Sequence, residues 1–317
     1  MQPAAPRISR AQAPAGVGNI GVGFDLLGHV FHGPRDVAHV RVIAEPVVRI
    51  DAITGDAPGA DRIPLDAASN TAGRALMSMR EALGLGHGFA IRLEKGIPLG
   101  SGLGGSAASC VAALVAANAL LQEPLERRAL YPFALDGEEA ASSSRQGDNV
   151  APMLLGGVVL ATAGEMIQLP VPGWLHCVVV HPDQVLETRR SREVLSEPFH
   201  LEQVVAHGAN LARFVLGLER ADAELIRAGL RDVLVEPRRA PLVPGFDAVK
   251  AAALAHDALG ASLSGAGPAV FAWFDSRARA EAAAPAMRAA FHSAGFTARS
   301  WVSPVAAPGA ALIETSA

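Results

Sequence analysis

The residues best suited to chemistry in this chain of 317 residues form a glycine-rich segment, PLGSGLGGSAAS, over 98–109. Four glycines within six residues do not favour a helix or a strand, because glycine loses more backbone freedom on ordering than other residues. The stretch over 107–121 is rich in Ala, Val and Leu and predicts a buried helix. A glycine loop that leads into a helix presents backbone N–H groups to a phosphate. Ser106 would then cap the helix or contact a metal ion on the phosphates.

Two common phosphate motifs fit this segment poorly. The P-loop of NTPases requires Lys and then Ser or Thr after its last glycine, whereas Ser-Ala-Ala follows here. The dinucleotide motif G-x-G-x-x-G is present, but it should leave a strand directly and meet an acidic residue at a strand end. The strand expected over 89–93 is separated from the loop, and the acidic residues at the right distance lie in a polar turn. A tight turn with Ser106 as N-cap stays the structural alternative.

A second glycine-rich segment, PAGVGNIGVGFDLLG over 14–28, contains one amide and one carboxylate, Asn19 and Asp25. Its glycines allow the backbone to approach a ligand closely, and these two side chains can hydrogen-bond to one. Taken alone, Asn and Asp between glycines are more often turn residues.

Other polar groups stand out further along the chain. Glu138 and Glu139 lie in a segment of Ala, Leu and Ser, predicted as a helix over 125–141, where an acidic pair is usually a solvated face. Arg192 and Arg239 lie in TRRSREVL over 188–195 and EPRRAPLVPG over 236–245. A guanidinium group is well suited to holding a carboxylate, although arginines in such runs are usually surface ion-pair partners.

Composition excludes several classes of partner. Half of the residues are hydrophobic, 18% are charged and the formal net charge is −4. The absence of a basic run argues against nucleic acid or an anionic membrane as the main partner. Cys110 and Cys177 have no metal-ligand spacing and fit a reducing compartment. Without a signal peptide or a membrane-length apolar run, we expect a soluble, cytoplasmic protein.

The elements that must position these residues alternate between strands and helices. In the first half we expect a loose N-terminus over 1–11, strands within 37–53, a loop over 51–66, a helix over 71–83 and strands over 89–93 and 158–160. In the second half we expect strands over 174–181, 269–274 and 296–303, and helices over 189–196, 201–218, 221–233, 245–258 and 276–294. The Pro- and Gly-rich run over 170–173 is the best linker and divides the chain into domains over 1–169 and 170–317. Strands and helices in this order predict an α/β or α+β fold.

Together, these motifs resemble those of the GHMP kinases, the superfamily of galactokinase and of the homoserine, mevalonate and phosphomevalonate kinases. The signature loop of the superfamily corresponds to 98–109, with Gly105 where many members have serine. The segment SLSGAGPAVF over 262–271 resembles its third motif; taken alone, that segment is a glycine turn between a helix and a strand. The segment GDNVAPMLLGG over 147–157 is most similar to homoserine kinases. Gln146 departs from that family, which usually has a histidine there that contacts the substrate; glutamine keeps a donor and an acceptor but carries no charge.

The resemblance implies a fold and a reaction. The fold would be α+β, with an N-terminal domain like the second domain of ribosomal protein S5, containing a left-handed βαβ crossover, and a ferredoxin-like C-terminal α/β sandwich. The reaction would be transfer of the γ-phosphoryl group of ATP to the hydroxyl of L-homoserine, with Mg²⁺, giving O-phospho-L-homoserine in threonine biosynthesis. These small molecules would be the partners, without nucleic acid or membrane, and a homodimer is compatible with the family.

The resemblance also assigns residues, motif by motif. Ser106 and Glu138 would hold Mg²⁺ and would form the catalytic set with Asn149; counting back from the following motif favours Glu138 over Glu139. Asn149 stands where mevalonate-type members have a catalytic aspartate, and because an amide is no base, positioning and charge neutralisation must dominate. The substrate residues would be Asn19, Asp25, Gln146, Arg192 and Arg239, the two arginines holding the carboxylate. The nucleotide residues would be Asn70, Pro98, Gly100, Ser101, Gly102, Leu103, Gly104, Gly105, Ser106, Ala107, Ser109, Ser264 and Gly265.

Three alternatives stay open. Asn70 would lie beside the adenine or would only cap the helix that follows it. The chain would be another GHMP kinase with a different alcohol as acceptor, although the arginine pair favours a substrate with a carboxylate. A non-catalytic nucleotide sensor is the third reading, and it is disfavoured because Ser106, Glu138 and the loop glycines are all present.

Overall fold

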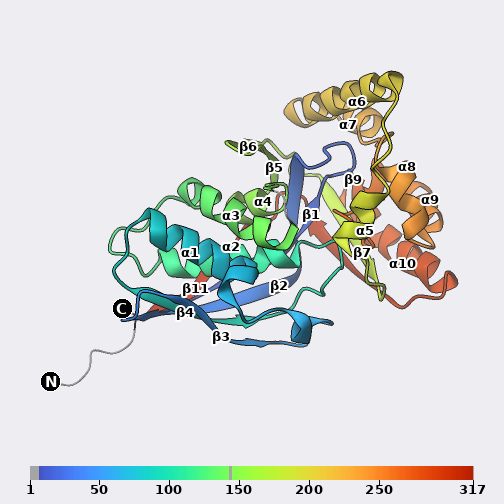
Figure 1. The fold of residues 1–317 in the computed structure, drawn as a ribbon. Helices are drawn as coiled ribbons and strands as arrows, with labels where there is room; N and C mark the ends of the chain where they lie inside the picture. Colours follow the sequence, from blue (N-terminus) through green and yellow to red (C-terminus); the bar gives the residue numbers. More distant parts are fainter. Residues whose placement is uncertain (1–6, 143–144, 317) are drawn as a thin grey trace.

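Two sheets, each covered by helices, make up the chain in the computed structural model (Figure 1), which describes residues 7–142 and 145–316. The first sheet has the order β11-β1-β2-β4-β3, and β5 pairs with β2 and β6. Its strands are β1 (Ile8–Gly18), β2 (Leu27–Ile43), β3 (Val48–Thr54), β4 (Gly88–Glu94), β5 (Val158–Ala161), β6 (Met166–Leu169) and β11 (Ala311–Ser316). Its helices are α1 (Thr71–Ala82), α2 (Gly105–Asn118), α3 (Tyr131–Ser142) and α4 (Val150–Leu155), with 3₁₀ turns at Ala60–Arg62, Ala67–Ser69 and Arg127–Leu130.

The second sheet is antiparallel and has the order β10-β7-β9-β8. Its strands are β7 (His176–Pro182), β8 (Gly260–Leu263), β9 (Val270–Phe274) and β10 (Ala298–Pro304). The helices of this half are α5 (Thr188–Glu193), α6 (Leu201–Glu219), α7 (Ala223–Gly229), α8 (Glu236–Arg239), α9 (Phe246–Leu254) and α10 (Arg277–Ser293), with a 3₁₀ turn at Ala240–Leu242. Numbered within this half, the strand order is 4-1-3-2, which confirms the expected ferredoxin-like sandwich.

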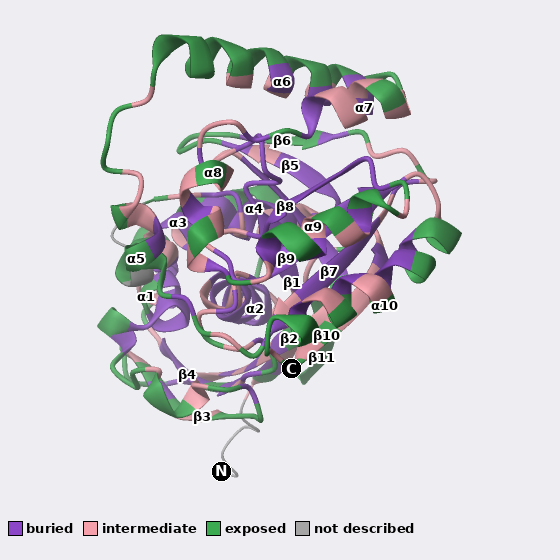
Figure 2. Cartoon of the chain, turned by 90° about the vertical axis from the view of Figure 1, so that its right-hand side faces the viewer, coloured by how far each residue is buried: buried purple, intermediate pink, exposed green. Residues whose placement is uncertain are grey.

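Helix α2 lies at the centre of the first half, where Figure 2 shows it as buried. Every residue from Ala107 to Asn118 is buried, as the apolar sequence predicts. The helix begins at Gly105, two residues before the predicted start. Helices α1 and α3 and the first sheet enclose the rest of α2. Its N-terminal end is therefore the part that faces the cleft described below.

The prediction of a loose N-terminus over 1–11 was wrong for residues 8–11, and residues 1–6 lie outside the described part of the chain. Residues 8–18 form β1, paired with β2 on one side and with β11 on the other. Its buried residues include Ala11, Ala13 and Ala15. Ala, Gly and Pro have low strand propensity. The segment forms a strand because it pairs with β2 and β11, and the sequence of the segment itself does not reveal this pairing. The strand expected over 296–303 as the last one corresponds to β10, and β11 follows it.

The division at 169/170 remains a prediction, and two observations complicate it. Strand β11 comes from the end of the chain but lies in the first sheet. One hydrophobic core cluster includes residues from both halves, such as Phe31, Val111, Phe214 and Trp273. A second cluster, confined to the later half, lies between its sheet and helices α9 and α10.

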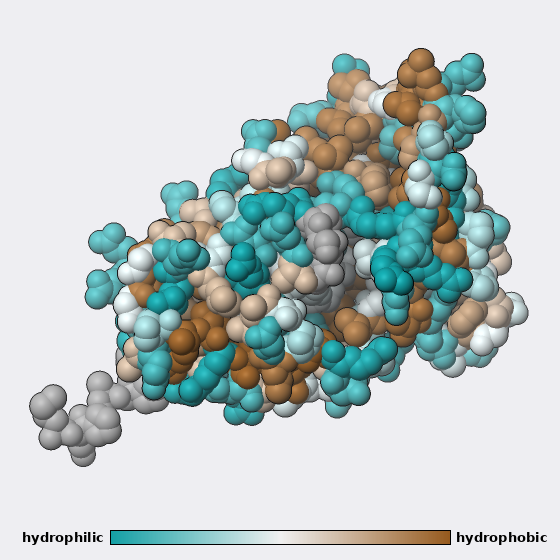
Figure 3. All heavy atoms as spheres, in the orientation of Figure 1, coloured by the Kyte–Doolittle hydropathy of each residue, from teal (hydrophilic) through white to brown (hydrophobic). Residues whose placement is uncertain are grey.

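Helices α6 and α7 project at one end of the molecule (Figure 1). The first turns of α6 expose Leu201, Val204 and Val205, and Figure 3 shows hydrophobic surface at that end. None of the described helices is long and apolar enough to cross a membrane.

Candidate active site

A cleft of about 520 Å³ opens between the two halves of the chain. One wall is formed by the loop over 98–104 and the start of α2. The opposite wall is formed by residues 185–189, Arg192, Arg239 and the turn over 265–267. The cleft therefore joins the segments that the sequence singled out.

The glycine loop requires glycine for its backbone conformation. Gly100, Gly102 and Gly104 have φ angles of 64°, 75° and 71°, in the left-handed region that L side chains rarely adopt. Gly104 is the N-cap of α2, and the first intrahelical bond runs from Ala108 N–H to Gly104 O at 2.9 Å. The N–H groups of residues 105–107 lie in the first turn of α2, before the first intrahelical bond, at the positive end of the helix dipole. This position favours the binding of an anion.

The turn over 264–268 supports the glycine loop from behind. Ser264 Oγ donates to Gly102 O at 2.7 Å, and Ala269 N–H donates to Ser101 O at 3.2 Å. A Cβ atom on Gly102 would lie 2.4 Å from Ser264 O, so only glycine permits this approach. Ser264 itself is fully buried and does not line the cleft.

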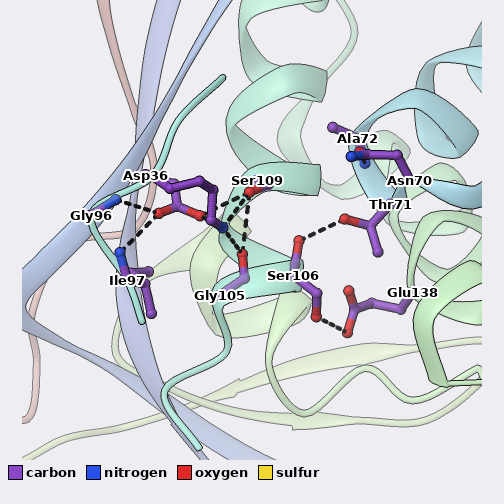
Figure 4. Close-up of polar contacts among 11 residues, drawn as sticks. Asp36, Asn70, Thr71, Ala72, Gly96, Ile97, Gly105, Ser106, Ser109 and Glu138 are labelled. Carbon is purple, nitrogen blue, oxygen red and sulfur yellow. Dashed lines mark hydrogen bonds and ion pairs between the residues drawn. The ribbon is translucent and has the colours of Figure 1, made fainter. Parts of the chain in front are cut away.

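Ser106 and Glu138 face each other, as Figure 4 shows. Ser106 Oγ donates to Glu138 Oε2 at 3.3 Å, and the N-cap is Gly104, so the alternative in which Ser106 caps the helix was wrong. Burial raises the pKa of Glu138 to about 7. Glu139 is exposed and lies 3.7 Å from Arg145.

One carboxylate and one guanidinium group pair in the cleft, and an amide bridges them. Arg192 Nη2 lies 3.1 Å from Asp25 Oδ1. Gln146 Nε2 donates to Asp25 Oδ2 at 2.6 Å, and Arg192 donates to Gln146 Oε1. The predicted substrate residues Asp25, Gln146 and Arg192 therefore form one hydrogen-bonded group.

Arg239 and Asn19 complete this end of the cleft. Arg239 is buried and donates to Ser191 O and to Gly265 O, both at 3.0 Å. Burial lowers its pKa to about 10, so the guanidinium group stays charged at neutral pH. Asn19 Nδ2 donates to Gly265 O at 2.8 Å, and Asn19 Oδ1 accepts from Asp25 N–H at 3.0 Å. Both arginines also lie over the ring of Phe24, with 5.8 Å from Arg192 Cζ and 5.1 Å from Arg239 Cζ to the ring centroid.

Asn149 lies beside a carboxylate that the sequence analysis missed. Asp148 Oδ1 accepts from Asn149 Nδ2 at 3.3 Å, and Asp148 Oδ2 accepts from Asn19 N–H at 3.2 Å. Burial, reinforced by the charge of Asp25, raises the pKa of Asp148 to about 7. Because Asp148 holds the amide nitrogen, Asn149 Oδ1 is left as an acceptor. That atom is buried and has no hydrogen-bond partner among the described residues.

Asn70 is the N-cap of α1. Its Oδ1 accepts from Ala72 N–H at 3.0 Å and from Gly73 N–H at 3.4 Å, and its Nδ2 donates to Pro64 O at 3.0 Å. The capping role is therefore confirmed. The side chain also lines the cleft, so contact with the nucleotide stays a prediction.

Most of the predicted site residues line one cleft. They are Asn19, Asp25, Asn70, Pro98, Gly100, Ser101, Gly102, Gly104, Gly105, Ser106, Ser109, Glu138, Gln146, Asn149, Arg192, Arg239 and Gly265. Leu103, Ala107 and Ser264 do not line it, because each is fully buried in the protein interior. The sequence analysis also missed Asp36 and Lys95, a buried ion pair behind the loop. The feature of the sequence that could have drawn attention to Lys95 is that the chain contains only two lysines.

Within the described residues, no group of three or more His, Cys, Asp or Glu side chains could hold a metal ion. A fully protein-bound metal centre of that kind is therefore not found there. The pair Ser106 and Glu138 supplies two oxygen donors, which suits a hard cation that takes its other ligands from a bound phosphate and water.

Comparison with known proteins agrees with this geometry. The family model for the GHMP kinase N-terminal domain matches residues 70–157, and the model for the GHMP kinase C-terminal domain matches residues 214–293. The chain is 58% identical to a homoserine kinase of Xylella fastidiosa, over 96% of this chain and 94% of that one. It is 57% identical to a homoserine kinase of Xanthomonas campestris, over 97% and 94%.

A solved structure gives the same result for the fold. The crystal structure of homoserine kinase from Cytophaga hutchinsonii superposes with a TM-score of 0.92 at 39% identity, covering 99% of each chain. The similarity therefore extends over both halves of the molecule and over the cleft between them.

Proposed function

This chain belongs to the GHMP kinase family, and on that premise we propose that it is a homoserine kinase. It transfers the γ-phosphoryl group of ATP to the side-chain hydroxyl of L-homoserine, forming O-phospho-L-homoserine for threonine biosynthesis. One observation carries the proposal: a glycine loop at a helix N-terminus and a cluster of one carboxylate and two guanidinium groups share one cleft. The loop suits a phosphate chain, and the cluster suits a zwitterion.

Ser106 and Glu138 would hold Mg²⁺ on the nucleotide. Both donors are oxygen atoms, they lie 3.3 Å apart, and Glu138 supplies the negative charge that a cation requires once its carboxyl group is deprotonated. Mg²⁺ in phosphoryl-transfer sites takes one or two protein oxygens and keeps several waters, so this donor set fits. When bound, the ion would neutralise charge on the phosphates. The loop N–H groups and the α2 N-terminus supply the rest of the anion site.

The charged cluster would bind the amino acid through its two charges. Asp25 would take the α-ammonium group, while Arg192 and Arg239 would take the α-carboxylate. Asp25 and Arg192 neutralise each other across 3.1 Å in the structure, and a zwitterion offers each of them a replacement charge. An alcohol with neither charge would have to separate this pair without compensation, which disfavours it.

Asn149 would position the hydroxyl that receives the phosphoryl group. Its Oδ1 is buried and available as an acceptor, because Asp148 holds its Nδ2. The homoserine O–H would donate to this oxygen, which directs the nucleophilic oxygen toward the phosphate. An amide does not take up a proton, so positioning and charge stabilisation supply most of the rate enhancement.

The proposed location is the cytoplasm. Cys110 and Cys177 are both buried and unpaired, which suits a reducing compartment. The proposed substrate ATP is also an intracellular compound.

A coupled assay of ADP release tests the proposal. The purified protein is assayed with ATP, Mg²⁺ and L-homoserine, L-serine, L-threonine or mevalonate, and the product is identified by mass spectrometry. We expect the highest kcat/KM with L-homoserine, and at least tenfold less with L-serine, because its hydroxyl is one methylene short of the required position. Preference for mevalonate would identify another alcohol kinase. Nucleotide binding without turnover of any acceptor would indicate a sensor.

A further inference from the structure

A buried polar cluster beside the glycine loop is formed by Asp36, Lys95 and Ser109. Figure 4 shows Asp36 and Ser109 of this cluster next to Gly105. Their exposed fractions are 0%, 4% and 4%. Strands β2 and β4 are antiparallel with Val37 opposite Glu94, so the same register brings Asp36 on β2 opposite Lys95, the residue after β4. Ser109 reaches the pair from the second turn of α2.

The Asp36 carboxylate accepts four hydrogen bonds. Its Oδ1 accepts from Gly96 N–H at 3.0 Å and from Ile97 N–H at 3.1 Å. Its Oδ2 accepts from Lys95 Nζ and from Ser109 Oγ, the latter at 2.8 Å. A carboxylate accepts about four hydrogen bonds, so this one is saturated. It holds Gly96 and Ile97, the two residues that precede the glycine loop.

The Lys95 ammonium group holds the other end of the loop. It donates to Asp36 Oδ2, to Ser109 Oγ at 2.7 Å and to Gly105 O at 2.7 Å. An ammonium group has three N–H bonds, so each has an acceptor and none remains for a phosphate. Lys95 also lines the cleft, but its three donors are taken up by Asp36, Ser109 and Gly105, the first residue of α2.

The residue type supports this reading. Of the 27 Lys and Arg residues, only Lys95 and Lys250 are lysine. A planar guanidinium group presents its donors in one plane, whereas the compact ammonium group can point three donors at acceptors that surround it. The site is thus one where this arginine-rich chain needs a lysine.

We propose that Asp36 and Lys95 are positioning residues for phosphoryl transfer, which fix the two ends of the phosphate-binding loop against each other. Asp36 holds Gly96 and Ile97, Lys95 holds Gly105, and the ion pair joins the two. The intervening residues 98–104 then present their N–H groups at a set spacing. The inference rests on the proposed function only in that the loop binds ATP.

A role in stability alone and a role in positioning the loop predict different results when the pair is replaced. Replacing a buried ion pair by apolar groups is often neutral or stabilising, whereas removal of one partner strands the other charge. A pair kept only for stability would therefore be replaceable as a unit. If the pair positions the loop, replacing both residues restores stability, but Gly105 O then loses its hydrogen bond from Lys95.

Three variants separate these roles: Lys95→Met, Asp36→Asn with Lys95→Met, and Lys250→Met as the control. Lys250 pairs with Glu236 outside the cleft lining. For each variant the melting temperature and the Kd of a non-hydrolysable ATP analogue with Mg²⁺ are measured by scanning and titration calorimetry. The KM of L-homoserine is measured in parallel.

We expect Lys95→Met to lower the melting temperature and to weaken analogue binding at least tenfold. In the double variant the melting temperature should recover, because no uncompensated carboxylate remains, while analogue binding stays at least tenfold weaker. The homoserine KM and the Lys250→Met control should change less than threefold. Recovery of analogue binding together with stability, or wild-type binding in either variant, would overturn the inference. If Lys95→Met does not fold, the double variant decides. A wild-type protein that fails to bind the analogue would instead refute the proposed function.

Discussion

Glu138 and Glu139 are consecutive carboxylates in opposite surroundings. Helix α3 directs Glu138 toward Ser106 in the cleft, and Glu139 toward solvent and Arg145. Residues one position apart on a helix do not share a face. The role of each carboxylate therefore follows from the helix that carries it, and the pair provides a variant with a matched control.

Glu138→Gln should lower kcat/KM for ATP with Mg²⁺ on the order of a hundredfold, as expected for removing one charged group that acts on the phosphates. The amide keeps the size of the side chain but loses the charge that binds the cation. Initial rates over a Mg²⁺ titration at fixed ATP measure the effect. Glu139→Gln should stay within twofold of the wild type. A normal Mg²⁺ response in Glu138→Gln would remove this residue from the metal site.

Arg239→Leu should raise the homoserine KM about tenfold or more, which corresponds to ~1.5–3 kcal/mol for a hydrogen bond to a charged group. The ATP KM should change little, because Arg239 lies at the amino-acid end of the cleft. Steady-state kinetics with each substrate varied in turn make the measurement. The matched control is Arg238→Leu, since Arg238 donates to Glu197 O and Pro198 O and does not line the cleft. Equal KM values for the two variants would refute the carboxylate-binding role.

At the scale of elements, the contact between the glycine loop and the turn over 264–268 sets the shape of the phosphate site. Gly102 and Gly84 both have positive φ, 75° and 60°. A Cβ atom on Gly102 would meet Ser264 O and Gly267 O at 2.4 and 2.7 Å, whereas one on Gly84 would meet nothing within 4 Å. Alanine would be strained at both positions because of the positive φ, but only at Gly102 would its Cβ atom also collide with neighbouring atoms.

Gly84→Ala should lower the free energy of unfolding by about 1–2 kcal/mol, because alanine is strained at positive φ. Gly102→Ala should lower it further, because its Cβ atom also collides with backbone atoms of the neighbouring turn. Gly102→Ala should also weaken binding of the ATP analogue at least tenfold, since the two loops must separate. Chemical denaturation and titration calorimetry give the two quantities. If both variants bind the analogue as the wild type does, the close approach of the loops is not needed for nucleotide binding.

Sequence predicts the elements whose signal is local. The apolar run of α2, the glycine loop and the capping by Asn70 could all be predicted, because composition and turn chemistry determine them. Strand β1 could not, since its Ala and Gly residues carry little strand propensity. Asp36 and Lys95 were missed because their pairing depends on strand register, which brings together residues 59 positions apart. Asp148 was missed because its importance lies in its burial beside Asn149.

At the scale of the molecule, the two halves share a core instead of meeting at a polar interface. The cluster that contains Phe31 and Val111 of the first half also contains Phe271 and Trp273 of the second. Domains joined by a large apolar contact are not expected to move freely against each other. The cleft walls should therefore hold their relative position while the loops adjust.

His29 joins the two sheets within this shared core. Trp273 Nε1–H of β9 donates to His29 Nε2 of β2 at 3.2 Å, and an indole nitrogen can only donate. The imidazole is therefore neutral, with its proton on Nδ1, which donates to Val30 O at 3.0 Å. Burial lowers the pKa of His29 to about 4, from an ordinary value of 6.5.

The pH dependence of stability follows from this shift. Between pH 6.5 and pH 4 the unfolded chain binds a proton at His29 and the folded chain does not, so the free energy of unfolding should fall as the pH falls. The loss is complete near pH 4 and amounts to roughly 3 kcal/mol. In His29→Gln the fall over this range should be smaller by that amount, whereas His32→Gln, at an exposed position, should follow the wild type. Urea denaturation at half-unit pH steps measures the difference, in which the other titrating groups cancel. If the free energy of unfolding depends on pH in the same way in the wild type and in His29→Gln, protonation of His29 does not contribute to the pH dependence of stability.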